Sequence, residues 1–168
     1  MTLLSEKLVT GLANRNHFLQ FIKSYLEEQP QGLLALLFVD LDKFKLINDQ
    51  FGHQEGDWVL KMVAKRIQSI IRESDFASRL GGDEFVVVLA EIKQKNDAFN
   101  VAKNLLKQIS KPYVNDVVIH SLAASIGIAF YPQDADNVQD LLNIADLAMY
   151  QAKRRGDKLH IFADIAKN

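Results

Sequence analysis

Two adjacent carboxylates, Asp83 and Glu84, follow a pair of glycines in the segment Gly81-Gly82-Asp83-Glu84-Phe85. Short apolar runs flank this segment on both sides, so the glycine pair predicts the tight turn of a β-hairpin. Glycine also lets a ligand approach the backbone closely. Carboxylates at a hairpin tip are hard oxygen ligands that could hold a divalent cation against a phosphate. The alternative is a solvated turn that happens to end in two acids, and these residues alone leave both readings open.

A second pair of acids, Asp40 and Asp42, follows the apolar run Leu33 to Val39. That run has the length and composition of a central strand that is buried on both faces and closes at Asp40. An acid at the end of such a strand is held at an edge of the sheet, where mixed α/β sheets tend to bind ligands. Asp40 and Asp83 together would supply the oxygen ligands expected for Mg²⁺ bridged to phosphates. The alternative is that Asp40 or Asp42 caps a following helical turn.

The segment from Phe51 to Asp57 contains two glycines and is predicted to be a loop. Asp57 precedes an apolar-periodic stretch and would be the N-cap of a helix. Alternatively, Asp57 and the Asn48 amide could bind the polar edge of a purine, because guanine offers paired N–H donors. His53 could ligate a metal, but a lone histidine in such a loop more often makes a hydrogen bond.

Apolar periodicity predicts the elements that position these residues. Helices are expected over residues 14–28 and about 57–73, from Phe99 to Ile109, and from Leu141 to Ala152 with an end at Gly156. The hairpin covers residues 76–90, and a strand is expected over 117–131, with Gly127 as a possible bulge, and another over 159–162. The fold class is therefore α/β (α+β), with a sheet that cannot be all parallel.

Composition limits the classes of function. The chain has 168 residues, 48% hydrophobic and 24% charged, which is typical of one soluble globular domain. A formal net charge of −1 argues against a nucleic-acid polymer as partner. The absence of cysteine excludes disulfides and fits a cytoplasmic location. No apolar run reaches the roughly 18 residues of a membrane span, and no signal peptide is evident. Both ends are abrupt, so we expect a module of a larger protein.

Taken in order, these motifs resemble the GGDEF domain of the diguanylate cyclase family. The name-giving motif stands at 81–85, with Asp40 to Asp49 and Phe51-Gly52-His53 upstream at the expected spacing. Thr10 to Arg15 resembles the family's entry motif, and Ala124 to Ala129 and Ala145 to Lys153 resemble its later blocks. The resemblance makes residues 1–168 a single GGDEF domain with a core of about 8–162. Parts of the amino-acid sequence also resemble GGDEF domains found in tandem with EAL phosphodiesterase domains.

The resemblance implies a palm-like nucleotide-cyclase fold with a mixed, mostly antiparallel central sheet flanked by helices. It implies the condensation of two GTP into cyclic di-GMP with release of two pyrophosphates, with Mg²⁺ or Mn²⁺ as cofactor. One domain would bind one GTP, so ring closure would need a homodimer. Cyclic di-GMP would be both product and inhibitor, and a covalently linked sensor or EAL domain is an expected partner.

The resemblance also assigns roles to particular residues. The metal would be held by Asp40, the Leu41 carbonyl, Asp83 and Glu84. Asp83 and Glu84 would be catalytic, with Asp83 accepting the proton of the 3′-hydroxyl. The hairpin glycines Gly81 and Gly82 would bind the substrate. Asn48 and Asp57 would recognise guanine, and His53 would line the nucleotide site. Phe44, Lys45 and Lys153 would hold the phosphates.

Arg72 and Asp75 stand ahead of the hairpin, where the family has its RxxD inhibitory product site. The arginine fork suits guanine or phosphate, and Asp75 could accept guanine N–H groups. The alternative is an i, i+3 salt bridge at a helix end, worth a few tenths of a kcal/mol.

Some residues depart from the family pattern. Lys7 and Val9 stand where the entry motif usually has Asp and Leu. Asp157 replaces a basic residue that helps to hold the triphosphate, and its charge would repel phosphate. The alternative function is thus a catalytically weak or inactive module that binds GTP or cyclic di-GMP and regulates an attached domain.

Overall fold

The structure, a computed structural model, describes residues 10–28, 32–155 and 159–161. Its elements in chain order are α2 (Arg15–Glu28), β1 (Leu34–Asp42), α3 (Phe44–Phe51), α4 (His53–Ile70), β2 (Phe76–Gly81), β3 (Glu84–Leu89), α5 (Lys95–Ile109), β4 (Tyr113–Val114), β5 (Ile119–His120), β6 (Ala123–Tyr131), α6 (Val138–Arg155) and β7 (Leu159–Ile161). Within these ranges no helix combines the length and apolar character of a membrane span.

A five-stranded sheet of order β2-β3-β1-β6-β7 forms the centre, and β4 and β5 form a separate hairpin. β1 pairs antiparallel with β3 and β6, β2 pairs antiparallel with β3, and β7 runs parallel to β6. The predicted α+β class with a mixed, mostly antiparallel sheet flanked by helices is confirmed. The hairpin 76–90 is confirmed as well, as β2 and β3.

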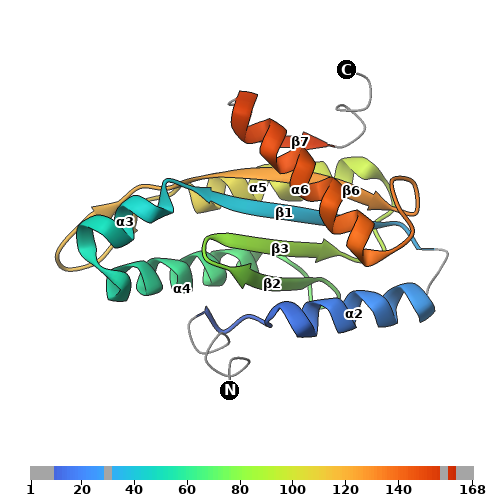
Figure 1. Cartoon of the computed structure of the whole chain (residues 1–168), viewed down its shortest axis with the longest axis horizontal. Helices are drawn as coiled ribbons and strands as arrows, with labels where there is room; N and C mark the ends of the chain where they lie inside the picture. Colours follow the sequence, from blue (N-terminus) through green and yellow to red (C-terminus); the bar gives the residue numbers. More distant parts are fainter. Residues whose placement is uncertain (1–9, 29–31, 156–158, 162–168) are drawn as a thin grey trace.

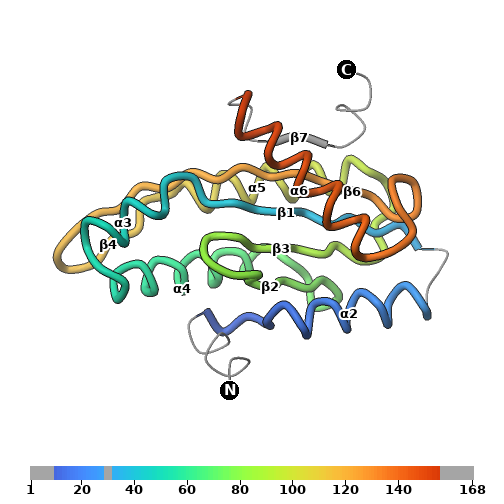
Figure 2. Tube along the Cα trace, in the orientation of Figure 1, coloured from blue at the N-terminus to red at the C-terminus, as the bar shows by residue number. Residues whose placement is uncertain are grey.

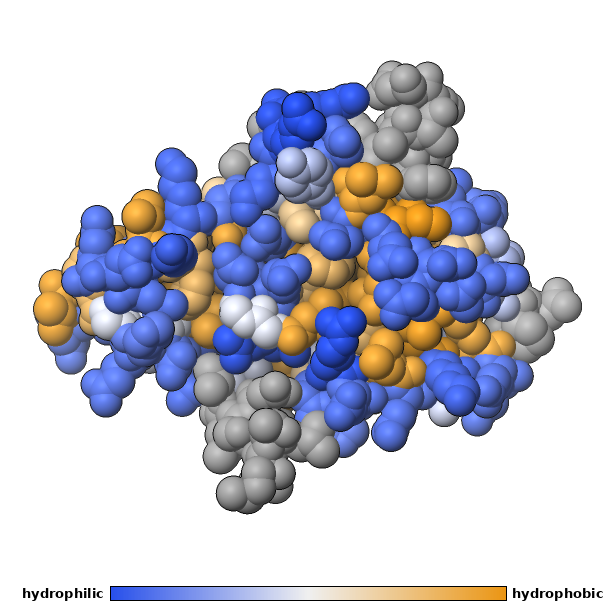
Figure 3. Space-filling model, viewed as in Figure 1, coloured by the Kyte–Doolittle hydropathy of each residue, from blue (hydrophilic) through white to orange (hydrophobic). Residues whose placement is uncertain are grey.

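Helices cover both faces of the sheet: α2 and α6 lie on one face, and α4 and α5 lie on the other (Figure 1). Side chains alternate along β1, so Leu36 and Phe38 pack toward α2 and α6, whereas Leu37 and Val39 pack toward α4 and α5. Figure 3 shows the α2/α6 face as mostly hydrophilic along its helices, with hydrophobic side chains gathered between them and at the end near α3. The central strand is therefore buried on both faces, as its apolar run predicts.

The end of β1 differs from its prediction. Asp40 does not close the strand, because β1 continues to Asp42 with every residue paired to β6. Lys43 then turns the chain with a left-handed φ of 63°, and α3 begins at Phe44. The apolar pattern predicted no helix here, since eight residues are too few to establish a periodicity. The alternative in which Asp40 or Asp42 caps a helix is wrong, because the N-cap position is Lys43.

The segment predicted as a loop before Asp57 is also different. α4 begins at His53, so Asp57 lies inside the helix and is not its N-cap. Gly52 alone, with a φ of 89°, separates α3 from α4. The second glycine, Gly56, is buried within α4 and marks a close approach of α3, not a loop.

The strand predicted over 117–131 is two strands, β5 and β6, and Gly127 is not a bulge. It pairs with Phe38 in an unbroken register. A Cβ on Gly127 would lie 2.1 Å from the Ala145 carbonyl oxygen and 2.1 Å from the Met149 nitrogen. Glycine is needed here because α6 lies directly on the strand. The helix end predicted at Gly156, the family departures Lys7, Val9 and Asp157, and Phe162 lie outside the described residues.

Candidate active site

The turn between β2 and β3 lies beside the end of β1 (Figures 1 and 2). The Leu41 N–H donates a hydrogen bond of 3.1 Å to the Asp83 carbonyl oxygen. One residue away, Asp40 is the cross-strand partner of Glu84. The sheet therefore brings together the four residues expected at the metal, although they come from two segments far apart in sequence.

The turn itself depends on its glycines. Gly81 and Gly82 have φ values of 150° and 51°, which favour glycine. A Cβ at either position would meet no atom within 4 Å, so the backbone conformation, and not crowding, calls for glycine. Arg79 Nε donates 3.0 Å to the Gly82 carbonyl oxygen and fixes the turn. The open space above both glycines leaves the backbone accessible to a ligand.

Asp40 and Asp42 lie on the face of β1 toward α6, where Lys153 meets them. The Lys153 Nζ lies 2.9 Å from Asp40 Oδ2 and 3.7 Å from Asp42 Oδ1. Ser125 of β6 donates 3.2 Å to Asp42 Oδ1. The side chain of Asp40 is 14% exposed, and its second oxygen, Oδ1, is buried without a hydrogen-bond partner among the described residues. A buried carboxylate oxygen with no donor is an uncommon and costly arrangement.

These acids disfavour one another's charge. Burial raises the pKa of Asp40, and the charges of Asp83 and Asp42 raise it further against the opposing effect of Lys153. Burial likewise raises the pKa of Glu84, followed by the charges of Asp40, Asp146 and Asp83. The pKa of Lys153 is also raised: burial acts to lower it, and the hydrogen bond and charge of Asp40 outweigh that effect. The cluster is thus a place where an added positive charge is stabilised.

A divalent cation fits this donor set. Among the described residues, no three His, Asp or Glu side chains already converge on one point as a finished metal site. Mg²⁺ does not require that, because it keeps several waters and binds through one or two carboxylates together with phosphate oxygens. The unpaired Asp40 Oδ1, with Glu84 opposite it on β3, offers hard oxygen ligands of this kind.

The predicted guanine-binding residues lie on the adjoining helices. The side chain of Asn48, on α3, lies over Gly56 of α4, where a Cβ would come 1.8 Å from its Oδ1. Asp57 is the next residue of α4 and is exposed, and His53 is exposed at the start of the same helix. The structure therefore places Asn48 beside the segment that carries Asp57, with His53 one turn before it.

The predicted phosphate-binding residues Phe44 and Lys45 occupy the first turn of α3. The Phe44 side chain is buried in the core, so only its backbone remains for a ligand. The Lys45 side chain is exposed. Lys43, at the N-cap, makes no side-chain capping hydrogen bond. The Leu46 N–H bonds the Lys43 carbonyl oxygen at 3.1 Å, so the N–H groups of Phe44 and Lys45 are the ones left for water or for an anion.

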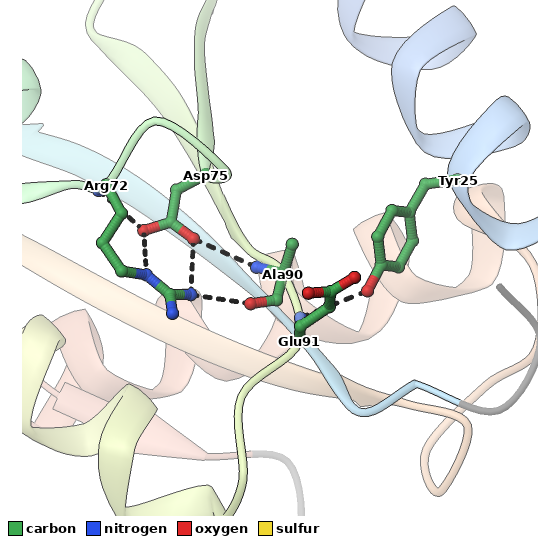
Figure 4. Close-up of polar contacts among 5 residues, drawn as sticks. All are labelled: Tyr25, Arg72, Asp75, Ala90 and Glu91. Atoms are coloured by element: carbon green, nitrogen blue, oxygen red, sulfur yellow. Dashed lines mark hydrogen bonds and ion pairs between the residues drawn. The ribbon is translucent and has the colours of Figure 1, made fainter.

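Arg72 and Asp75 lie apart from this cluster, between α4 and β2 (Figure 4). Asp75 Oδ1 accepts from Arg72 Nη2 at 2.8 Å and from the Ala90 N–H at 3.1 Å. Arg72 Nη2 also donates 2.6 Å to the Ala90 carbonyl. The side chain of Asp75 is 2% exposed and that of Arg72 is 55% exposed. The pair thus makes the i, i+3 salt bridge, and Arg72 in addition borders a cavity of about 310 Å³.

The sequence reasoning missed three residues that shape the site. Ser125 is a polar residue in an otherwise apolar strand and orients Asp42. Gly56, a glycine inside a helix, makes room for Asn48. Arg79 fixes the hairpin turn. The first two carry a sequence signal, an interruption of apolar or helical pattern, but its meaning depends on a partner that is distant in sequence.

Solved structures that superpose on this chain include several GGDEF domains. The crystal structure of the GGDEF domain of TpbB from Pseudomonas aeruginosa superposes with a TM-score of 0.85 at 42% identity, covering 89% of this chain and 96% of that one. The GGDEF domain of DgcB from Caulobacter crescentus, solved in complex with c-di-GMP, gives 0.83 at 26% identity over 92% of this chain and 94% of that one.

The sequence matches the family described as "Diguanylate cyclase, GGDEF domain" over residues 8–158. The chain therefore belongs to the GGDEF domain family. It is 43% identical over 150 residues to the diguanylate cyclase TpbB of Pseudomonas aeruginosa, covering 88% of this chain and 34% of that protein. It is 40% identical over 151 residues to the cyclic di-GMP phosphodiesterase NbdA of the same species, covering 88% of this chain and 19% of that protein. The chain thus spans about a third or less of these relatives.

Proposed function

We propose that this domain is a metal-dependent diguanylate cyclase, which condenses two GTP into cyclic di-GMP with release of two pyrophosphates. The observation that carries the proposal is the buried Asp40 Oδ1, which has no hydrogen-bond partner in the described part of the chain and lies next to Glu84 and the open glycine turn. A carboxylate oxygen left without a donor in this position is suited to a cation that arrives with a phosphate. The similarity to TpbB, a protein named as a diguanylate cyclase, supports the same activity.

Different residues would bind the metal and transfer the proton. Asp40, the Leu41 carbonyl, Asp83 and Glu84 would hold Mg²⁺ or Mn²⁺. A bound divalent ion supplies charge neutralisation at the α-phosphate as the 3′-oxygen attacks. Asp83 would take the proton of that 3′-hydroxyl, within a turn whose shape is fixed by the hairpin glycines and Arg79.

The nucleotide would lie along α3 and α4. At the guanine edge, the Asp57 carboxylate would accept hydrogen bonds from guanine N–H groups and the Asn48 amide would donate or accept, with His53 lining the site. The uncapped first turn of α3, with the Phe44 backbone and the Lys45 side chain, would bind phosphate oxygens together with Lys153. Gly81 and Gly82 would let the triphosphate approach the hairpin backbone.

Ring closure joins two nucleotides, so two such domains would face each other in a homodimer. We propose that residues 1–168 form a single GGDEF domain, with a core of about 8–162, that works as a cytoplasmic module of a larger protein. A covalently linked sensor or EAL domain would then set the geometry of the pair. The much greater length of TpbB and NbdA supports this view.

Arg72 would bind the product cyclic di-GMP as an inhibitor. Its exposed guanidinium faces the cavity lined in part by Glu91, Lys93 and Asp97, and its planar fork suits guanine or phosphate. Asp75 has both oxygens engaged within the protein, so its part at this site would be to hold Arg72 in place.

The test is turnover by a forced dimer. The chain would be fused to a parallel two-stranded coiled coil, incubated with GTP and Mg²⁺ or Mn²⁺, and assayed for cyclic di-GMP by chromatography. We expect product from the wild type and none from Asp40→Asn or Asp83→Asn. Absence of product from the wild-type dimer would overturn the cyclase assignment, and wild-type rates in either variant would overturn the metal assignment.

A second candidate function is a binding module without turnover, which regulates an attached domain. Asp157, an acid in place of a phosphate-holding base, and the similarity to a protein named as a phosphodiesterase favour it. Calorimetry with GTP and with cyclic di-GMP separates the two functions, because this candidate requires binding of one ligand without product formation. A domain that binds neither ligand would exclude it.

A further inference from the structure

Lys153 forms ion pairs with both Asp40 and Asp42. Its ammonium group lies 2.9 Å from Asp40 Oδ2 and 3.7 Å from Asp42 Oδ1, reaching across from α6 to β1. Asp42 is held from the other side by Ser125. Lys153 therefore contacts one acid, Asp42, that also accepts a hydrogen bond from β6, and one acid, Asp40, whose hydrogen bond is made to Lys153 itself.

The two oxygens of Asp40 are in different situations. Oδ2 accepts the hydrogen bond from Lys153, whereas Oδ1 is buried and has no partner among the described residues. A divalent ion at Oδ1 would share one carboxylate with the ammonium group. Two cations on the same carboxylate repel each other, and each reduces the negative charge left for the other.

The ammonium group of Lys153 can also move away from Asp40 and Asp42. Its side chain is 43% exposed, and a lysine makes point-charge contacts through a flexible stem, in contrast to the fixed fork of an arginine. A triphosphate carries several negative charges and would compete with Asp40 and Asp42 for the ammonium group.

We propose that Lys153 is a built-in counter-ion that weakens metal binding by the nucleotide-free domain, and that its transfer to the triphosphate couples metal binding to nucleotide binding. This inference rests on the proposed function for the identity of the nucleotide. It makes Lys153 a residue with opposite effects on the two ligands: it opposes the metal and favours the nucleotide. A purely structural lysine would not act in opposite directions.

The metal arm of the test uses Mn²⁺ alone. Binding to the nucleotide-free domain is measured from the loss of the free Mn²⁺ signal in electron paramagnetic resonance, for wild type, Lys153→Met and Arg154→Met. Arg154 is the matched control because it is the next residue of α6, is exposed, and loses the same charge on substitution. We expect Lys153→Met to bind Mn²⁺ about tenfold more tightly than Arg154→Met, since the lost ammonium group lies nearest the site. Equal affinities in the two variants, or no Mn²⁺ binding by any of the three, would overturn the proposal.

The nucleotide arm uses GTP in the presence of EDTA, measured by calorimetry. We expect Lys153→Met to bind GTP more weakly than Arg154→Met, the reverse of the order for Mn²⁺. Weaker binding of both ligands by Lys153→Met would show a structural role and overturn the proposal. Lys153→Gln, which keeps a hydrogen-bonding group without the charge, serves as the second variant if Lys153→Met unfolds, and should bind Mn²⁺ more tightly as well.

The two arms separate this inference from the proposed function. Tighter Mn²⁺ binding by Lys153→Met that is lost in the double variant with Asp40→Asn supports the counter-ion role even if the dimer makes no cyclic di-GMP. Turnover by the wild-type dimer together with unchanged Mn²⁺ affinity in Lys153→Met removes the counter-ion role and leaves the cyclase.

Discussion

The side chain of Asn48 occupies the space that a Cβ on Gly56 would need, since that atom would lie 1.8 Å from Asn48 Oδ1. Glycine within a helix is less favourable than alanine by about 1 kcal/mol. Gly56 is nevertheless buried within the eighteen-residue helix α4. The close approach of α3 explains it: without Gly56, Asn48 could not lie against α4 next to Asp57.

Gly56→Ala is therefore expected to displace Asn48 and weaken GTP binding. The loss of the hydrogen bonds expected between Asn48 and guanine predicts a roughly tenfold or greater rise in Kd, measured by calorimetry. The double variant with Asn48→Ala tests the cause. If Gly56 acts through Asn48, adding Gly56→Ala to Asn48→Ala changes the affinity little, because the two residues share one interaction. Additive losses would contradict this explanation.

How far sequence predicts this protein depends on whether a residue's partner is local. The buried strand, the hairpin and its glycines follow from apolar runs and turn residues that are contiguous in sequence, and the structure has them. The sequence predicts a loop at Gly56 and a possible bulge at Gly127, and both predictions are wrong because each glycine is required by a helix that approaches from elsewhere: α3 over Gly56 and α6 over Gly127. Tertiary contacts of this kind leave no periodic trace.

The acidic residues Asp40, Asp42 and Glu84 show the same contrast between what is local in sequence and what depends on a distant partner. The i, i+2 spacing of Asp40 and Asp42 puts both on one face of β1, but only the register with β3 brings Glu84 opposite Asp40. The hydrogen bond from Lys153 to Asp40 joins residues 113 positions apart. Resemblance to a family supplied these positions as a set, whereas the physical reasons for them appear only in the folded chain.

Glu84→Gln is expected to make the metal-free domain more stable and inactive. Burial and then the charges of Asp40, Asp146 and Asp83 raise the pKa of Glu84 above its ordinary value of 4.5. A carboxyl whose pKa is raised by folding destabilises the native state at pH values above that raised pKa, where it is ionised. Glutamine removes the charge, so we expect Tm near pH 7 to rise by about 1–2 °C in EDTA, a small shift because the side chain is partly solvated.

Two measurements test whether Glu84→Gln gains stability and loses activity. Thermal melts of wild type and Glu84→Gln should converge as the pH falls, since the wild-type carboxyl becomes neutral. The forced dimer should lose turnover in the variant. A lower Tm at pH 7 would show that Glu84 stabilises the fold as a charged residue, contrary to the direction of its pKa.

Substitutions of Asp75 and Arg72 are expected to affect different properties: the first mainly stability, the second mainly inhibition by cyclic di-GMP. Asp75 is buried and bonds the Ala90 N–H as well as Arg72, so Asp75→Ala leaves unpaired groups between α4 and β3. It should lower the free energy of unfolding by about 1–3 kcal/mol in urea denaturation. Arg72→Ala removes a side chain that is largely in solvent and should cost less, yet it should relieve inhibition by cyclic di-GMP. Equal stability losses, or unchanged inhibition in Arg72→Ala, would leave Arg72 with the salt bridge as its role.

The outer part of the β4–β5 hairpin is attached to α4 through Glu55. Glu55 Oε1 lies 2.7 Å from His120 Nε2 and accepts a second hydrogen bond from Asn115 Nδ2, while the ring of His120 contacts that of Phe51 edge-on. Tyr113 at the base of the hairpin is buried in the core, whereas Val114, Val117 and Ile119 farther out are 61%, 90% and 65% exposed. The base of the hairpin is thus held by core packing, and the hydrogen bonds to Glu55 hold the part beyond Tyr113.

This arrangement predicts a pH dependence with a definite sign. The hydrogen bond with His120, followed by that from Asn115, lowers the pKa of Glu55 below its ordinary value of 4.5. A carboxyl with a pKa lowered by folding stabilises the native state above 4.5 and loses that contribution as the pH falls through the lower, folded-state value. Glu55→Gln lacks this titration. The difference in unfolding free energy between wild type and Glu55→Gln, from urea denaturation at a series of pH values, should shrink as the pH falls below about 4.5. A difference that does not change with pH would mean that packing of the hairpin, and not the charge on Glu55, holds it to α4.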